Sequence, residues 1–260
     1  MMQFTTRLLA NRKISSDYHQ LVFEWDGGAG TPRPGQFVTL RSESGIDPLL
    51  KRPFAVAGHA GGQAVEIIIQ IRGRVSRSIC EMKPGGTLLM TGPLGNAFPM
   101  PVENTVPVLL AGGAGIGPII FLYRELTAVR GPVRAVFGFR NVESTPAGFL
   151  ESIAGDGPVS ICTDNGGTGF RGTVIDYLRS RIPPEPGKQV MYACGPLPMM
   201  AAAYSCSESR KVPLWVSMEQ VMACGIGACM GCVIRTNGKN PFARVCKDGP
   251  VFNAQEVVWT

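Results

Sequence analysis

The chain has 260 residues, of which 45% are hydrophobic and 17% are charged, so it can bury a large core and is not a disordered protein. The net charge of +6 is spread without a basic tail or a basic helix, which argues against a nucleic-acid-binding protein. The uncharged run 104–123 holds six glycines and prolines, so we expect a buried strand, a turn and a helix there, not a membrane span. Residues 1–9 lack the apolar segment of a signal peptide, and we expect a cytoplasmic protein.

Residues 1–100 are predicted to form a small antiparallel β-barrel domain. Segments rich in β-branched and aromatic residues alternate with turns of glycine and proline, as in compact β proteins. One helix is expected, at Val75–Met82. The expected strands are Phe4–Leu9, Tyr18–Trp25, Gln36–Arg41, Phe54–Gly58 and Ala64–Ile71.

Residues 101–215 alternate strands with helices, which predicts a doubly wound, mostly parallel α/β sheet. The apolar run Val106–Ala111 is the first expected strand, and a helix follows it to about Val129. The further expected strands are Val133–Phe139, Val159–Thr163, Gln189–Cys194 and Leu214–Met218. The further expected helices are Phe149–Ile153, Val174–Arg181 and Pro198–Glu208.

Residues 216–260 are expected to form a small lobe held together by a metal site, because the segment is too short for a large core of its own. Four of the eight cysteines fall here, as Cys224-x4-Cys229-x2-Cys232 followed by Cys246. The first gaps match the plant-type spacing for a [2Fe–2S] cluster, and the interleaved glycines let backbone N–H groups approach sulfur. Zinc, or a reduced and empty cysteine group, remains the alternative, although zinc sites usually add a second cysteine pair or histidines.

Two further segments suit phosphate binding. The loop Gly112–Pro118 follows a strand and opens a helix, so its glycines and the helix N-terminus can accommodate a pyrophosphate. An ordinary strand-to-helix turn has the same pattern. Arg52 stands near a strand start, and Arg72, Arg74 and Arg77 follow about twenty residues later. The planar arginine fork suits phosphate, and a solvated basic edge is the alternative.

The segment Cys194-Gly195-Pro196 leaves a strand and leads into a helix, which is also compatible with a plain turn. The order of these three segments resembles that of the ferredoxin–NADP reductase superfamily. The stretches 222–232 and 244–252 resemble, more narrowly, the electron-transfer subunits of class 1B dihydroorotate dehydrogenases. The resemblance extends over essentially the whole chain. It implies an FAD-binding barrel, an NAD-binding α/β domain and a C-terminal [2Fe–2S] lobe.

The resemblance also implies roles for single residues. The FAD positions would be Arg52, Pro53, Phe54, Ala55, Ile68, Ile69, Gln70, Val75 and Ser76. The NAD site would be framed by Gly112, Gly113, Gly115, Gly117, Gly195 and Pro196, with Cys194 as catalytic residue. The cluster ligands would be Cys224, Cys229, Cys232 and Cys246. The family usually has Ser or Thr in place of Ala55 and glycine in place of Val75, so we expect an altered flavin potential and a looser phosphate contact, which Arg74 or Arg77 could offset.

The activity implied by the resemblance is electron conversion. A flavin exchanges single electrons with a cluster and hydride with a nicotinamide, so it belongs between them. Electrons would pass from the FMN of a dihydroorotate-oxidising partner subunit through the cluster and FAD to NAD⁺. Two copies of each subunit would assemble. The resemblance favours NAD over NADP, although Arg140, after the strand Val133–Phe139, could accommodate a 2′-phosphate.

Two other interpretations remain. Related FAD and [2Fe–2S] subunits serve a hydrogenase, a sulfide reductase or a bifurcating transhydrogenase, and they share the flavin and nucleotide parts. An interaction domain that is held together by zinc would bind no flavin and would be colourless. The segment Asp248–Phe252, together with the four cysteines, favours the dihydroorotate dehydrogenase subunit.

Overall fold

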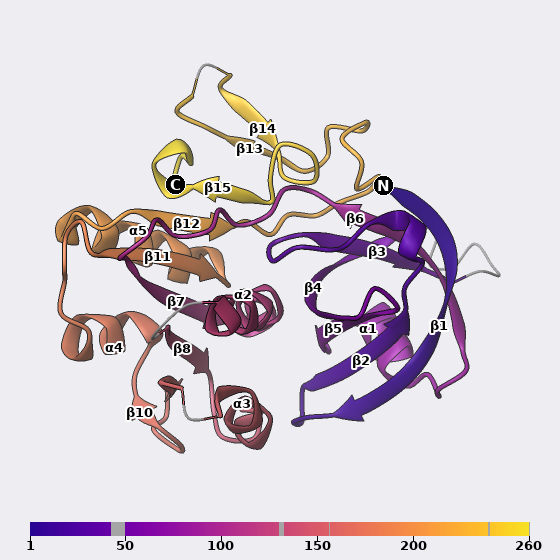
Figure 1. Cartoon of the computed structure of the whole chain (residues 1–260), viewed down its shortest axis with the longest axis horizontal. Coiled ribbons are helices and arrows are strands. Elements are labelled where there is room, and N and C mark those ends of the chain that lie inside the picture. Colours follow the sequence, from indigo (N-terminus) through magenta and orange to yellow (C-terminus); the bar gives the residue numbers. More distant parts are fainter. Residues whose placement is uncertain (43–49, 130–132, 156, 239, 260) are drawn as a thin grey trace.

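The computed structural model describes residues 1–42, 50–129, 133–155, 157–238 and 240–259. The chain forms a closed barrel, a seven-stranded sheet with flanking helices and a small two-stranded hairpin (Figure 1). This architecture confirms the predicted combination of an antiparallel barrel with an α/β domain. Within the described ranges, no helix has the length and apolar character needed to cross a membrane.

Six antiparallel strands close the barrel in the order β1-β2-β5-β4-β3-β6. They are β1 (Met2–Lys13), β2 (Tyr18–Glu24), β3 (Phe37–Arg41), β4 (Arg52–Ala60), β5 (Ala64–Gln70) and β6 (Thr87–Leu94), and helix α1 (Arg74–Cys80) follows β5. Side chains alternate between the two faces of a strand. One face fills the barrel with an apolar core that includes Leu21, Phe23, Val38, Leu40, Val56 and Ile67.

The sheet has the strand order β10-β9-β8-β7-β11-β12-β15. Its strands are β7 (Val106–Gly112), β8 (Arg134–Phe139), β9 (Val159–Thr163), β10 (Phe170–Arg171), β11 (Gln189–Cys194), β12 (Leu214–Ser217) and β15 (Val251–Asn253). Neighbours are parallel except β15, which is antiparallel to β12. The chain runs from β7 outward through β8 and β9 to β10 and then returns to the other side of β7 at β11. The topological switch point, where ligands of such sheets bind, therefore lies between β7 and β11.

Helices cover both faces of the sheet. Leu109, Phe137 and Tyr192 share one core with helix α2 (Ile116–Val129). Val108 and Met191, on the opposite face, share another core with helices of the second layer. These helices are α4 (Val174–Arg181) and α5 (Leu197–Arg210), whereas α3 (Ala147–Ala154) packs beside β9. Helix α2 also contacts β4 and β5, so it lies between the sheet and the barrel (Figure 1).

The cysteine-containing segment packs against both the barrel and the sheet (Figure 1). It includes the hairpin of β13 (Val233–Arg235) and β14 (Phe242–Arg244) before it returns to the sheet as β15. Phe37 and Leu94 of the barrel share a buried core with Met222, Cys232 and Cys246. The cysteines are therefore anchored against the barrel end that carries Phe37.

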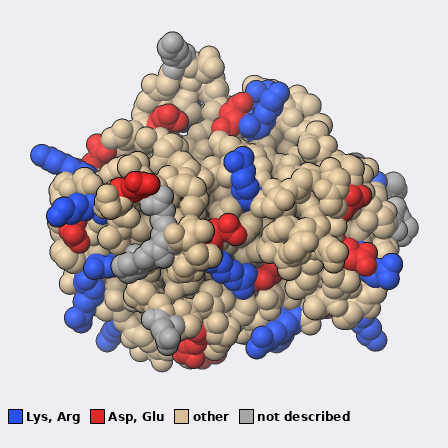
Figure 2. Space-filling model, in the orientation of Figure 1, with Lys and Arg blue, Asp and Glu red and all other residues tan. Residues whose placement is uncertain are grey.

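Surface charges are interspersed rather than gathered by sign. Figure 2 shows basic and acidic side chains distributed over the same face of the molecule. The net charge of +6 does not form one continuous patch on the face shown.

Candidate functional site

A cavity of about 580 Å³ opens at the rim of the barrel toward the sheet. All nine residues predicted to contact FAD line this cavity. They come from three segments, since residues 52–55 lie on β4, residues 68–70 on β5 and residues 75–76 on α1. The structure thus brings the three sequence segments to one wall, and their assignment to FAD remains a prediction.

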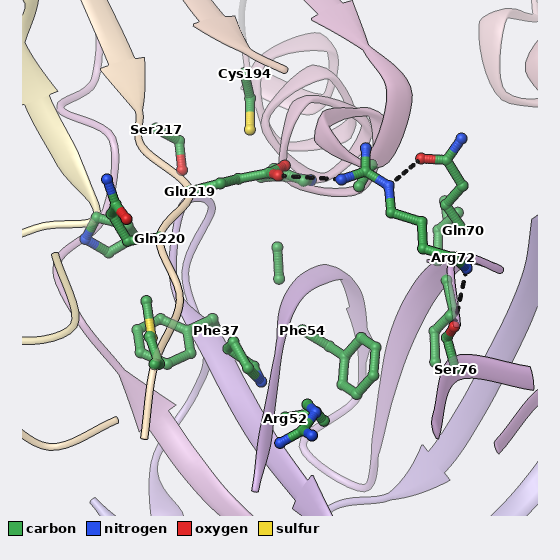
Figure 3. Close-up of a pocket in the computed structure, with 18 of the residues that line it drawn as sticks. Phe37, Arg52, Phe54, Gln70, Arg72, Ser76, Cys194, Ser217, Glu219 and Gln220 are labelled. Carbon is green, nitrogen blue, oxygen red and sulfur yellow. Dashed lines mark hydrogen bonds and ion pairs between the residues drawn. The ribbon is translucent and has the colours of Figure 1, made fainter. Parts of the chain in front are cut away.

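The opposite wall carries polar side chains from the carboxyl ends of the sheet strands (Figure 3). Cys194 ends β11, Ser217 ends β12, and Glu219 follows β12. Burial and the nearby Glu219 carboxylate raise the pKa of the Cys194 thiol, and a hydrogen bond with Ser217 only partly opposes them. The predicted catalytic residue Cys194 therefore presents a neutral thiol, not a thiolate, to the cavity at neutral pH.

Arg72 connects the two walls. Its Nη1 lies 3.9 Å from Glu219 Oε2, and its Nε donates to Gln70 Oε1 at 2.9 Å (Figure 3). Its backbone N–H donates to Ser76 Oγ at 2.9 Å. Burial raises the pKa of Glu219, and the Arg72 guanidinium opposes this shift. Arg72 therefore places a positive charge between the barrel and the sheet, where an anionic ligand group can be bound.

A second cavity, of about 1100 Å³, lies over the carboxyl ends of β7, β8 and β9. Three of the residues predicted to frame NAD line it, namely Gly112, Gly113 and Pro196. Arg140 and Asp164 contribute charged side chains farther along the same strand ends. Gln70 and Arg72 line both cavities, so the two cavities adjoin each other.

Two of the other three predicted glycines, Gly115 and Gly195, stand where backbone segments pack closely. A Cβ on Gly115 would overlap the backbone carbonyl of Cys194, and one on Gly195 would lie 2.9 Å from the carbonyl oxygen of Gly112. The loops after β7 and β11 therefore contact each other backbone to backbone. Gly117 faces the barrel instead, because a Cβ there would lie 3.6 Å from the Ala57 Cβ.

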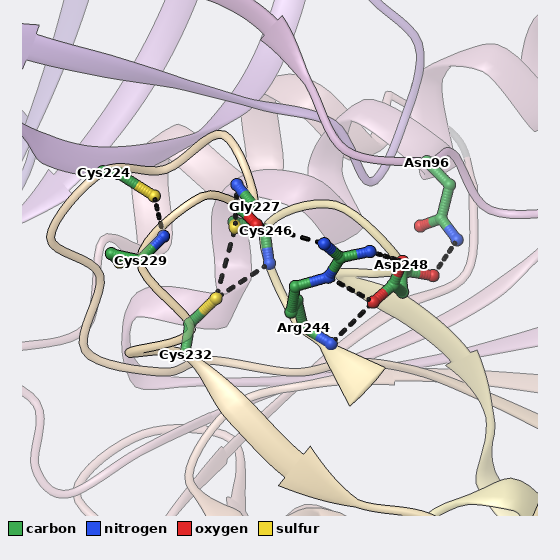
Figure 4. Close-up of polar contacts among 8 residues, drawn as sticks. All are labelled: Asn96, Cys224, Gly227, Cys229, Cys232, Arg244, Cys246 and Asp248. Carbon is green, nitrogen blue, oxygen red and sulfur yellow. Dashed lines mark hydrogen bonds and ion pairs between the residues drawn. The ribbon is translucent and has the colours of Figure 1, made fainter. Parts of the chain in front are cut away.

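The four cysteines of the C-terminal segment form two pairs (Figure 4). Cys232 Sγ lies 3.2 Å from Cys246 Sγ, and the Cys229 N–H donates to Cys224 Sγ at 3.4 Å. Among the residues that the structure describes, no three His, Cys, Asp or Glu side chains converge on a single metal ion. Two cysteine pairs suit a two-iron cluster, in which four thiolates are shared by two irons.

Backbone donors surround the sulfurs of these cysteines. Burial alone would raise the pKa of Cys224, but hydrogen bonds from the N–H groups of Ile226, Cys229 and Ala228 lower it to about 6. The Gly227 N–H likewise donates to Cys246 Sγ at 3.1 Å. Donors directed at sulfur stabilise thiolate ligands, and iron–sulfur clusters are tuned by such hydrogen bonds. The donor set and the loop therefore fit a [2Fe–2S] cluster.

Arg244 and Asp248 brace the loop that carries Cys246. Arg244 Nε and Nη2 donate to the two Asp248 carboxylate oxygens at 2.9 and 3.0 Å, and Arg244 Nη1 donates to the Gly227 carbonyl at 3.1 Å (Figure 4). The hydrogen bonds from Arg244 hold the pKa of Asp248 below its usual range. This two-pronged ion pair orients the turn that carries Cys246.

Several lining residues were not singled out from the sequence. Ser217 and Glu219 join the first cavity at the end of β12, and Met222 and Pro250 join it from the segment that carries the cysteines. Met222 shares a buried core with Phe37 and Leu94 of the barrel, so packing between distant parts of the chain brings it there. Of the arginines considered as phosphate contacts, Arg74 lines the first cavity, whereas Arg77, in the last turn of α1, is not part of its wall.

Comparisons with known proteins agree with this geometry. Residues 219–258 match the family model described as the iron-sulfur cluster binding domain of dihydroorotate dehydrogenase B. The chain is 35% identical over 256 residues to the dihydroorotate dehydrogenase B (NAD(+)) electron transfer subunit of Caldanaerobacter subterraneus subsp. tengcongensis, with 97% of each chain covered. It is 36% identical over 232 residues to the subunit of the same name from Geobacillus kaustophilus, with 87% of each covered.

Solved structures show the same fold. A chain of the NADH-dependent reduced ferredoxin–NADP oxidoreductase, studied for flavin-based electron bifurcation, superposes with a TM-score of 0.81 at 26% identity, covering 98% of this chain and 90% of that one. The ferredoxin reductase of carbazole 1,9a-dioxygenase superposes with a TM-score of 0.73 at 22% identity, covering 82% and 67%. Because the identity to the Caldanaerobacter subunit extends over nearly the full length of both proteins, the chain belongs to the family of dihydroorotate dehydrogenase B electron transfer subunits.

Proposed function

We propose that this chain accepts electrons from a dihydroorotate-oxidising partner subunit and delivers them to NAD⁺, using a [2Fe–2S] cluster and FAD. Its relatives are named electron transfer subunits of dihydroorotate dehydrogenase B (NAD(+)). These names support dihydroorotate as the source of the electrons and NAD⁺ as their acceptor. The partner is proposed to carry FMN and to assemble with this chain as two copies of each. We also propose a cytoplasmic location for the complex, because a thiolate-bound cluster needs reduced cysteines.

The first cavity is the proposed FAD site. A bound flavin exchanges electrons singly with an iron–sulfur cluster and as hydride with a nicotinamide. Arg52 and Arg74 place positive charge in the wall, where they can bind the phosphates of the cofactor. Phe37, Phe54 and Met222 make part of the same wall apolar, which excludes water from the ring. Ala55 offers this ring only its backbone and a methyl group.

The second cavity is the proposed NAD site. Gly112 and Gly113 let the backbone approach a pyrophosphate at the switch point between β7 and β11. A dinucleotide bound there can extend toward the shared residues Gln70 and Arg72, and so toward Cys194 in the first cavity. Cys194 is proposed to contact the nicotinamide as a neutral thiol.

One observation carries the proposal. The flavin cavity is bordered on one side by the nucleotide cavity, through Gln70 and Arg72, and on the other by Phe37 and Met222, which belong to the same buried core as Cys232 and Cys246. This arrangement supports the proposal, because the three proposed sites would then lie in the order that single-electron and hydride transfer require.

The test is dihydroorotate-dependent NAD⁺ reduction by the complex isolated through a tag on this chain from its native host. We expect activity that disappears when the partner is stripped away and returns when it is added back. The matched variants are Cys246→Ser, which removes a cluster ligand, and Cys80→Ser, which changes a buried cysteine of the barrel. Only the first is expected to abolish electron transfer while FAD remains bound.

Two outcomes would contradict the proposal. A preparation that holds FAD and iron but does not respond to dihydroorotate would assign the chain to another electron donor, such as that of a hydrogenase or a bifurcating enzyme. A colourless preparation that contains zinc would exclude electron transfer altogether.

A further inference from the structure

The Thr39 hydroxyl is a buried polar group that lacks a partner. Thr39 lies on β3, only 2% of its surface is exposed, and its Oγ1 makes no hydrogen bond in the described structure. Buried hydroxyls are nearly always hydrogen-bonded, because leaving one unpaired costs its full desolvation. We therefore expect the Thr39 hydroxyl to have a hydrogen-bond acceptor next to it in the native protein.

The side chain of Thr39 faces the cysteine segment. Val38 and Leu40 point into the barrel core, so the alternation of a strand places Phe37 and Thr39 on the outer face. Phe37 packs there in the core that contains Cys232 and Cys246. Thr39 lies beneath the same lobe, because a Cβ on Gly225 would be 3.0 Å from the Thr39 methyl carbon.

Gly225 directly follows Cys224, the first cysteine of the loop. It has a φ of +69°, a left-handed conformation that favours glycine, and its open Cβ side faces the Thr39 methyl group. The Cys224 sulfur already receives hydrogen bonds from its own loop, from the N–H groups of Ile226, Ala228 and Cys229 and from the Cys229 side chain. The barrel places beside this loop a buried hydroxyl, that of Thr39, which has no partner among the described residues.

We propose that the Thr39 hydroxyl donates a hydrogen bond to a sulfur of the [2Fe–2S] cluster on its Cys224 side and so raises the reduction potential of the cluster. The inference rests on the proposed function, because the acceptor is the cluster. A donor to sulfur stabilises the more negative, reduced state of a cluster. Thr39 also pairs with Pro53 across β3 and β4, and Pro53 lines the flavin cavity. The residue that tunes the cluster therefore belongs to the strand pair that forms the flavin wall.

The test compares Thr39→Val with Thr39→Ser in the complex of this chain with its partner. Valine keeps the shape and removes the donor, whereas serine keeps the donor. We expect the valine variant to lower the equilibrium constant for cluster reduction about tenfold, which is about 59 mV for one electron. The serine variant should retain the wild-type potential. The measurement is a redox titration followed by electron paramagnetic resonance, with the flavin potential and iron content recorded in parallel.

The matched control is Thr6→Val. Thr6 is as buried as Thr39, but its hydroxyl already donates to the Glu24 carbonyl at 2.7 Å. That variant should lose stability without any shift in the cluster potential. A second measurement detects the hydrogen bond of the exchangeable Thr39 hydroxyl by vibrational spectroscopy of the cluster. Exchange into D₂O should shift the Fe–S stretching bands, and the shift should shrink in Thr39→Val.

Three results would overturn the inference. One is a valine variant with normal iron content and an unchanged potential, which would leave the proposed function intact. Another is an unchanged D₂O shift in that variant. The third is a purified complex without iron, which would refute the cluster itself and therefore the proposed function as well.

Discussion

The side chain of Asn96 and the backbone of Val251 form a reciprocal hydrogen-bonded pair. The Val251 N–H donates to Asn96 Oδ1 at 2.9 Å, and Asn96 Nδ2 donates to the Val251 carbonyl at 3.0 Å. Asn96 follows β6 of the barrel, whereas Val251 begins β15 of the sheet. Asn96 Nδ2 also donates to the Asp248 carbonyl at 3.1 Å. One side chain therefore joins the barrel, the sheet and the segment after Cys246.

Asn96→Ala is expected to destabilise the chain by roughly 2–4 kcal/mol, because three hydrogen bonds of about 1 kcal/mol each are lost and buried groups are left unpaired. Urea unfolding measures this cost, and iron content reports whether the cysteine segment stays ordered. The control is Asn237→Ala, which removes one exposed bond to the Gln255 carbonyl. Equal and small effects of the two variants would show that Asn96 does not join the three parts.

A second connection joins α2 to the barrel. Arg124 Nη1 donates to Glu66 Oε2 at 2.8 Å and to the Ala57 carbonyl at 3.2 Å, and the Glu66 side chain is only 15% exposed. Glu66→Gln leaves the guanidinium without its counter-charge, so we expect a loss of about 1–3 kcal/mol. The exposed pair of Arg7 and Glu24, 3.7 Å apart, provides the control, since Glu24→Gln should change stability by less than about 1 kcal/mol.

Denaturant unfolding of the flavin-loaded protein distinguishes these two ion pairs. If both substitutions shift the midpoint by the same amount, burial does not strengthen the pair on α2. If only Glu66→Gln lowers the midpoint, the Arg124–Glu66 pair stabilises the contact between α2 and the barrel. That contact fixes the position of the first cavity relative to the second.

Local patterns predicted most of the fold. The apolar run at β7 and the glycines after it are visible in a short window, because a parallel strand buried on both faces is continuously apolar. Strand β6 was missed, since Gly92 and Pro93 inside it have the composition of a turn. The short strands β13, β14 and β15 were missed as well. Their pairing depends on distant partners, as when Val251–Asn253 adds to the sheet edge at β12.

The candidate site likewise has parts that follow from local sequence and parts that depend on contacts between distant segments. The cysteine spacing is local, and it favours a two-iron cluster over the zinc alternative. The contribution of Glu219, Met222 and Pro250 to the flavin cavity is not local, because it arises from packing the C-terminal segment on the barrel. Thr39 had no sequence signal at all, since only its burial beneath Gly225 distinguishes it from other strand threonines.

Gly115→Ala tests the contact between the two nucleotide loops. The new Cβ would overlap the Cys194 carbonyl, and backbone cannot move aside cheaply. We expect a strain of about 1–3 kcal/mol, seen as about 5- to 150-fold weaker NADH binding with FAD content unchanged. Titration calorimetry measures the affinity. Gly148→Ala on α3 is the control, because no atom lies within 4 Å of its Cβ position. Unchanged NADH affinity in Gly115→Ala would refute the proposal that these two loops form the NAD site.

The N-terminus of α4 provides a pH-dependent test of local stability. Thr173 Oγ1 accepts from the Asp176 N–H at 3.2 Å, and Asp176 Oδ2 accepts from the Thr173 N–H at 2.9 Å, which is a reciprocal cap. Hydrogen bonds from Thr173 lower the pKa of Asp176. A lowered carboxyl pKa in the folded state means that its stabilisation is complete above the unfolded value of about 3.9 and disappears as pH falls through the folded value.

Thr173→Ala should therefore cost about 1 kcal/mol at neutral pH, and the difference from wild type should shrink below about pH 4. Urea unfolding at several pH values between about 3 and 7 measures both quantities. Ser180→Ala is the control on the same helix, since the Ser180 hydroxyl donates back to the helix carbonyls of Asp176, at 2.7 Å, and Tyr177, at 3.5 Å. Its effect should stay within about 0.5 kcal/mol at every pH. A Thr173→Ala difference that does not change with pH would show that the Asp176 carboxylate contributes nothing to the cap.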